Sequence, residues 1–174
     1  MEEISNLRKL QLEELKILKM FRTICEENDL RYYLLGGTLL GAVRHDGFIP
    51  WDDEIDVCMP REDYDKFQKI AEKRLKKPYY LTSLENNKDY RYCFARIATE
   101  NMKIRNNSAN IPRIEDVWID IIPLDGMPAN KVKNFFHKIH MYFWRSMNQI
   151  GQYDEIVDQK RKRSTIEGIL VKIA

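Results

Sequence analysis

Residues 35–60, LGGTLLGAVRHDGFIPWDDEIDVCMP, constrain the fold of this chain more than any other part of the sequence. They place a pair of glycines about one short helix ahead of a cluster of acidic residues. Gly36 and Gly37 allow backbone N–H groups to approach an anion closely, and Thr38 can cap a helix whose positive end faces the same anion. The segment therefore predicts a phosphate-binding turn beside a group of carboxylates.

The acidic residues that follow the glycines occupy four of five consecutive positions: Asp52, Asp53, Glu54 and Asp56. Their mutual repulsion is costly unless a cation lies among them, and carboxylate oxygens suit Mg²⁺ or Mn²⁺. Residues 54–59 alternate polar and apolar positions, so in a strand Glu54 and Asp56 share one face. Asp52 has the same parity, whereas Asp53 is expected to point away.

A candidate for the third ligand of such a cation is Asp120, which lies in the apolar stretch VWIDIIPL. This stretch is rich in β-branched residues and predicts a buried strand, where a charged residue needs a specific role. The glycine pair, the acidic cluster and Asp120 together predict a metal-assisted phosphate site.

Other interpretations of these features remain open. An acidic cluster after a turn is often solvated surface, and a glycine pair is often only a turn. Asp52, Glu54 and Asp56 also match the first ligand positions of an EF-hand calcium loop. That match fails at its sixth position, which is Val57 instead of Gly, and at its twelfth, which is Asp63 instead of Glu.

Four further residues are candidates for substrate binding. Arg44 and His45 lie between the glycines and the acids, where Arg can pair with a diphosphate and His can orient it. Trp51 can stack on a base, and Arg96 can reach the same pocket. Structural roles are equal alternatives: loop stabilisation for His45, a core or rim position for Trp51, and a salt bridge to one of the acids for Arg96.

The segment GGTLLGAVRHDGFIPWDDEIDVCMPREDYDKF, together with IDIIPLDGMP, resembles the LicD family. These cholinephosphotransferase-like proteins modify bacterial surface glycans, and fukutin and fukutin-related proteins are related to them. The resemblance covers roughly residues 30–127. It implies a nucleotidyltransferase-like α+β fold with a small mixed sheet flanked by helices, a long N-terminal helix and a C-terminal helical pair.

The resemblance also implies an activity. It predicts a Mg²⁺-dependent (or Mn²⁺-dependent) enzyme that moves phosphocholine or a similar phospho-alcohol from a CDP-linked donor to a glycan hydroxyl, in lipopolysaccharide, teichoic acid or capsule synthesis. Glu54 and Asp56 would be the metal pair and Asp120 the third acid. Gly36 and Gly37, with Thr38 and Asp52, would line the donor site. The family more often has Asp where this chain has Glu54. Nucleotidyl transfer with pyrophosphate release, or nucleotide binding without catalysis, are the alternatives.

Composition agrees with a soluble domain. The chain has 174 residues, of which 44% are hydrophobic and 32% charged. We expect a single domain with a helical extension over 1–28, a core over 30–127 and C-terminal helices over 130–174. The sequence ends inside an apolar helical pattern, so we expect it to be cut short. Three widely spaced cysteines with apolar neighbours predict buried free thiols and a cytoplasmic location.

Charge is unevenly distributed along the chain. Residues 50–66 contain seven acids against two basic residues, whereas residues 131–174 contain nine Lys or Arg against four acids. The basic part can attract an anionic glycan, a nucleotide or the inner face of a membrane, although a solvated helix face is the simpler interpretation. No aromatic residues interleave with the basic run, so nucleic-acid binding is not expected.

The hydrophobic pattern predicts the order of the elements. Helices are expected over residues 3–28, 38–44, 61–76, 131–149 and 153–172, and strands over 32–35, 54–59, 79–84, 91–98 and 117–124. A polar loop is expected over 106–112.

Overall fold

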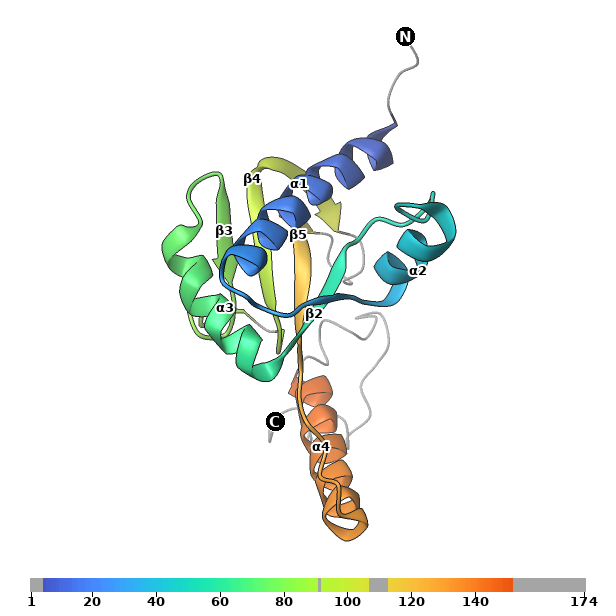
Figure 1. Ribbon diagram of the computed structural model, residues 1–174, viewed down its shortest axis with the longest axis vertical. Helices are drawn as coiled ribbons and strands as arrows, with labels where there is room; N and C mark the ends of the chain where they lie inside the picture. The colour runs from blue at the N-terminus through green and yellow to red at the C-terminus, as the bar shows by residue number, and fades with distance from the viewer. Residues whose placement is uncertain (1–4, 91, 107–112, 152–174) are drawn as a thin grey trace, which may run out of the picture. The chain divides into compact units, whose positions relative to one another are not determined.

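The computed structural model describes residues 5–90, 92–106 and 113–151. The elements in chain order are α1 (Asn6–Glu27), β1 (Tyr33–Leu34), α2 (Gly36–His45), β2 (Asp56–Pro60), α3 (Arg61–Arg74), β3 (Tyr79–Thr82), β4 (Ala95–Asn106), β5 (Arg113–Leu124) and α4 (Lys131–Gly151). Figure 1 shows this arrangement. The mixture of helices and sheet confirms the predicted α+β class.

The five strands form one mixed sheet in the order β1-β2-β5-β4-β3. Strand β2 pairs antiparallel with β1 and parallel with β5, and β3 pairs antiparallel with β4. The parallel pair sets Asp56 opposite Asp120 and Val57 opposite Ile121. Because β2 and β5 lie in the middle of the sheet, these residues are held by strands on both sides.

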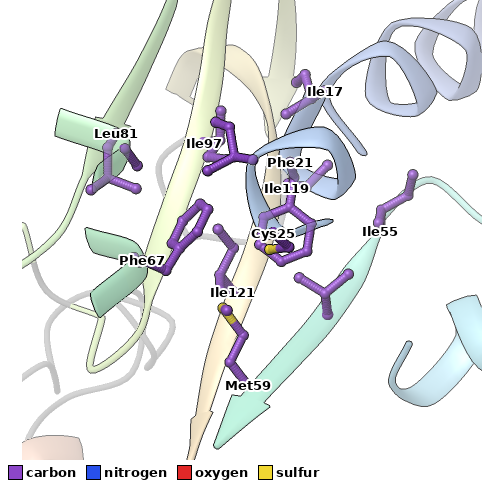
Figure 2. Packing of buried hydrophobic residues seen from close by; sticks show 14 of the residues in the cluster. Ile17, Phe21, Cys25, Ile55, Met59, Phe67, Leu81, Ile97, Ile119 and Ile121 are labelled. Atoms are coloured by element: carbon purple, nitrogen blue, oxygen red, sulfur yellow. The ribbon is translucent and has the colours of Figure 1, made fainter. Parts of the chain in front are cut away.

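Helices α1 and α3 cover the same face of the sheet (Figure 1). On α1, Ile17, Phe21 and Cys25 follow one another at helical spacing and are fully buried. They pack against Phe67 of α3 and against Ile119 and Ile121 of β5 (Figure 2). The ring centroids of Phe21 and Phe67 are 5.0 Å apart. This apolar layer fixes which residues of β2 and β5 face the helices.

Successive side chains of a strand point to opposite faces of its sheet. Since Val57 and Ile121 face the helices, their neighbours Asp56 and Asp120 project from the other face. Both aspartates therefore leave the apolar layer, although each lies next to a fully buried residue in the sequence.

The chain divides into two compact units, one of residues 1–104 and 116–125, and one of residues 105–115 and 126–174. The prediction of a single domain stays a prediction. In the second unit, α4 carries several exposed apolar and aromatic side chains, among them Phe135, Phe136, Tyr142 and Trp144. Among the described residues, none of the helices has the length and hydropathy needed to cross a membrane.

Several predicted boundaries were wrong. Helix α2 begins at Gly36 instead of 38, so the glycines belong to its first turn, and β2 begins at Asp56 instead of 54. Strands β4 and β5 are longer than predicted, at twelve residues each. Cys25 and Cys58 are buried as expected, but Cys93 is exposed. The predicted helix over 153–172 and most of the predicted loop over 106–112 lie outside the described residues.

Candidate functional site

The first turn of α2 lies directly against two carboxylates. Gly36 has φ +54°, in the left-handed region, and a Cβ placed there would lie 3.7 Å from Asp56 Oδ2. A Cβ on Gly37 would lie 2.6 Å from Asp52 Oδ2, closer than real Cβ contacts occur. Glycine is therefore required at Gly37 for the carboxylate to approach the helix start, and the positive end of α2 faces negative charge there.

Thr38 does not cap the helix, so that prediction was wrong: the N-cap residue of α2 is Leu35, which makes no side-chain cap hydrogen bond. The Thr38 hydroxyl instead accepts a hydrogen bond of 2.9 Å from the backbone N–H of Asp56. The backbone N–H of Leu35 donates to the Asp56 carbonyl at 3.0 Å. Two hydrogen bonds thus join the start of α2 to the start of β2.

Asp56 and Asp120 are register partners across the parallel strands β2 and β5. The Asp120 N–H also donates to the Ile55 carbonyl at 2.9 Å, which extends the pairing to the residue before β2. Burial and the neighbouring Asp120 charge raise the pKa of Asp56. Burial and the charge of Asp56 likewise raise the pKa of Glu54. The three acids predicted from the sequence are therefore close enough to repel one another.

Arg96 of β4 forms the salt bridge that the sequence left open for it. Its Nε lies 2.7 Å from Asp120 Oδ1, and both side chains are largely buried. The guanidinium carbon lies 4.0 Å from the ring centre of Tyr92 and 4.3 Å from that of Trp118. Burial still raises the pKa of Asp120 above its usual value, against the lowering effect of Arg96. The aromatic contacts fix the arginine beside the acids.

The residues of this site fit a divalent cation in chemistry and charge. Asp52, Glu54, Asp56 and Asp120 offer hard oxygen ligands, and Arg96 alone does not neutralise them. Among the residues that the structure describes, however, no three acidic, histidine or cysteine side chains already surround a point that could hold an ion. Side-chain rotation would have to complete a coordination shell, so the predicted Mg²⁺ or Mn²⁺ stays a prediction.

Arg44 and His45 lie away from the glycine turn. Arg44 and His45 form the last turn of α2, about 12 Å along the helix axis from Gly36. The ring centroids of His45 and Trp51 are 6.4 Å apart, and Trp51 is 76% exposed. This contact matches the loop and rim roles considered for His45 and Trp51, and substrate binding by all three residues stays a prediction.

A cavity of about 280 Å³ lies between α1, α2 and the loop that follows α2. Its walls are mostly apolar, from Leu15 and Leu18 of α1 and Phe48 of the loop. Thr38 and Asp52 form polar parts of its lining. The cavity therefore offers space for a ligand group next to the acidic loop.

Sequence reasoning missed two residues of α1 that reach the acidic loop. The Gln11 side-chain amide donates to the Asp52 carbonyl at 2.9 Å. Glu14 is buried near the same loop, and its neighbouring charges are Asp53, Asp52, Glu54 and Asp120. A signal existed: in the helical stripe Leu10, Glu14, Ile17 and Phe21, the glutamate occupies a position where an apolar residue is expected.

The aromatic residues around Arg96 were also missed. Tyr92 and Trp118 come from the segment before β4 and from β5, so only the strand pairing brings them together. The alternation of aromatic residues in YRYCFAR was a visible signal that residues 90, 92 and 94 share a side, and their rings do lie 5.3–5.4 Å apart in succession.

The mixed sheet, the helix that starts at a glycine pair and the carboxylates on adjacent strands define an α+β domain built around an acidic site. Residues 29–148, more than half of the chain, match the family model described as the LicD/FKTN/FKRP nucleotidyltransferase domain. The chain belongs to this family. The resemblance stated from the sequence is thereby confirmed.

Curated relatives support the same assignment. The chain is 37% identical over 126 residues to the lipopolysaccharide cholinephosphotransferase LicD of Haemophilus influenzae, covering 70% of this chain and 45% of that protein. It is 48% identical over 40 residues to the human ribitol 5-phosphate transferase FKRP, covering 23% of this chain and 8% of that protein. The chain thus spans less than half the length of these relatives.

Proposed function

We propose that this protein transfers a phospho-alcohol, such as phosphocholine, from a CDP-linked donor to a hydroxyl group of a cell-surface glycan, with release of CMP. The printed names of the LicD and FKRP relatives both describe transfer of a phosphate that carries an alcohol. The observation that carries the proposal is the register of Asp56 and Asp120, which brings two carboxylates together beside the glycine start of α2.

The residues of this chain suit the binding of a diphosphate. The backbone N–H groups in the first turn of α2 have no partner within the helix and can donate to phosphate oxygens. Arg96 adds a fixed positive charge next to Asp120. A Mg²⁺ ion held by Glu54, Asp56 and Asp120 would neutralise the charge that develops on the diphosphate. Most of the catalysis would then come from positioning and charge stabilisation.

In the proposed reaction, the acceptor hydroxyl oxygen attacks the phosphorus atom that carries the alcohol. The bond from this phosphorus to the bridging oxygen breaks, and CMP leaves with the electron pair. The hydroxyl proton passes to a carboxylate of the site. Where Asp120 does not itself complete the coordination of the cation, it is the carboxylate for this role, because its raised pKa makes its ionised form a better proton acceptor than an ordinary aspartate.

The test is to incubate the purified protein with Mg²⁺, candidate glycans and, in separate reactions, CDP-choline, CDP-ribitol and CDP-glycerol, and to measure CMP. Asp56→Asn should lower CMP release by about 100-fold or more, because it removes a carboxylate from the reacting centre. Asp65→Asn is the matched control, since Asp65 is an exposed residue of α3. Equal CMP release by wild type and Asp56→Asn would contradict the proposal.

The same assay separates the alternatives. Release of pyrophosphate from CTP, without CMP release from any CDP-linked donor, would indicate a nucleotidyltransferase. Binding of the CDP-linked donors with no turnover in any reaction would indicate a nucleotide-binding module.

A further inference from the structure

Helix α4 carries an apolar stripe that the core described above does not use. The stripe consists of five residues that recur with the spacing of one side of a helix, each of them at least half exposed: Val132, Phe135, Phe136, Ile139 and Phe143. Among the described residues, the apolar core comes from residues between Leu10 and Ile121 and includes none of α4. A contiguous exposed stripe with three phenylalanines marks an interaction surface.

The charge of α4 indicates what this surface binds. The helix carries four basic residues and no aspartate or glutamate: Lys131, Lys133, Lys138 and Arg145. At about 3.6 residues per turn, all four lie outside the apolar stripe. A helix with aromatic residues on one side and basic residues on the rest of its surface is suited to an anionic lipid surface. Its apolar side enters the boundary between headgroups and acyl chains, and its basic residues are attracted to the headgroup phosphates.

Two aromatic residues beside the apolar stripe fit the same environment. Tyr142 and Trp144 lie on its two sides, and both are more than half exposed. Each ring combines an apolar body with a polar group, which favours a position at the boundary between water and lipid. Lys138 lies near the middle of α4, where a charge would be costly at the centre of a bilayer. The orientation that suits all these residues is therefore parallel to the membrane surface.

We propose that α4 binds the surface of an anionic membrane and lies in its plane, with the apolar stripe among the lipid chains and the basic residues against the headgroup phosphates. This binding does not depend on the proposed function, because the proposed transfer uses residues that precede α4 in the chain. The alternative occupant of the stripe is a second copy of α4. Pairing two copies would bring together two helices with four positive charges each and no acidic residue to compensate them.

The experiment measures co-sedimentation of the full chain with vesicles of phosphatidylcholine alone and of an equal mixture of phosphatidylcholine and phosphatidylglycerol. We expect binding to the mixed vesicles that weakens as the salt concentration rises, and much weaker binding to phosphatidylcholine alone. The double variants Phe136→Gln/Phe143→Gln and Lys133→Gln/Lys138→Gln should each weaken binding to the mixed vesicles by about tenfold or more.

Two control variants make the same types of change on other helices. Leu39 and Val43 are exposed apolar residues of α2, and Lys66 and Lys69 are exposed basic residues of α3. Leu39→Gln/Val43→Gln and Lys66→Gln/Lys69→Gln should bind the mixed vesicles as the wild type does. Equal losses in these variants and in the α4 variants would overturn the proposal, because the binding would then follow overall hydrophobicity or net charge.

Three other results would also overturn it. The first is no binding of the wild type to the mixed vesicles. The second is self-association in sedimentation velocity that Phe136→Gln/Phe143→Gln abolishes, which would assign the stripe to a second copy. The third is a large fall in the melting temperature of this variant without vesicles, which would show that the stripe is packed inside the protein. Release of CMP by the wild type in vesicle-free buffer tests the proposed function separately.

Discussion

Arg96 Nε lies 2.7 Å from Asp120 Oδ1, and the two side chains are only 12% and 14% exposed. Removing one partner of a buried ion pair leaves an uncompensated charge, which costs about 3–5 kcal/mol. We therefore expect Arg96→Met to lower the free energy of unfolding by about that amount in cation-free buffer, as measured by urea denaturation. If the proposed cation site exists, added Mg²⁺ should restore part of the loss, because a cation held there would neutralise Asp120.

Lys103→Met is the control for this experiment. Lys103 lies on the same strand and forms an ion pair with Asp116, but its side chain is 62% exposed. Exposed pairs contribute about 0–1 kcal/mol. If Arg96→Met costs no more than Lys103→Met, the ion pair in the site is not stabilising.

Two glycines of α2 should respond differently to substitution by alanine. A Cβ on Gly41 would lie 2.5 Å from the backbone carbonyl oxygen of Gly47, whereas the atoms nearest to a Cβ on Gly37 belong to the Asp52 side chain. A backbone atom cannot rotate away, so Gly41→Ala should lower the melting temperature strongly. Gly37→Ala should displace the carboxylate and lower CMP release with a smaller change in melting temperature.

Gly126→Ala is the matched control for both variants, because no atom of the described residues lies within 4 Å of the position that its Cβ would take. Thermal unfolding and CMP release should both stay at the wild-type level. The opposite order of effects, with Gly37→Ala the less stable and the more active variant, would contradict the described contacts of α2.

Thr38 should be replaceable by Ser but not by Val. Its hydroxyl accepts the hydrogen bond from the Asp56 N–H, and valine has the same shape without the oxygen. A buried donor left without a partner costs about 1–3 kcal/mol. In urea denaturation, we expect Thr38→Val to lower the free energy of unfolding by that amount. Thr38→Ser should retain most of the stability that the hydrogen bond provides. Equal losses in the two variants would show that the oxygen is not the cause.

Glu14 should make the stability of the wild type depend on pH. Its pKa is about 9 in the folded protein and near 4.5 when unfolded, so between these values the folded state holds a proton that the unfolded state has lost. Stability therefore falls as pH rises through this range, by at most about 1.4 kcal/mol per pH unit. Glu14→Gln should lack this slope, and its stability relative to wild type should increase from pH 6 to pH 8 in buffer with EDTA. Parallel profiles of stability against pH for the wild type and Glu14→Gln would contradict this prediction.

The sequence was sufficient to predict the elements whose apolar residues recur at a clear period. The spacing of Leu10, Phe21 and Cys25 predicted α1, and Pro60 marked the start of α3, as observed. Strand β4 was cut short because Thr99 and Glu100 interrupt its apolar run. Met102 and Ile104 continue the alternation beyond them and pack against the core, so the signal was present but was not used.

The site could be predicted only where its residues are close in sequence or have an unusual type. Gly36, Gly37, Glu54 and Asp56 fall within one segment, and Asp120 is a charged residue in an apolar strand. The Thr38 contact was predicted incorrectly because a helix cap is a local rule, whereas its partner Asp56 comes from another element. Gln11 and Tyr92 join the site only through helix packing and strand pairing, which no local pattern describes.

The register of β2 against β5 has a consequence for evolution and for engineering of this protein. A slip of one residue would turn Asp120 toward α1 and bring Ile119 or Ile121 to the side where Asp56 projects. What prevents that slip is the apolar packing of Val57, Ile119 and Ile121 under the helices, none of which touches a substrate in the proposed reaction. Substitutions that loosen this apolar layer are therefore expected to abolish activity before they unfold the chain.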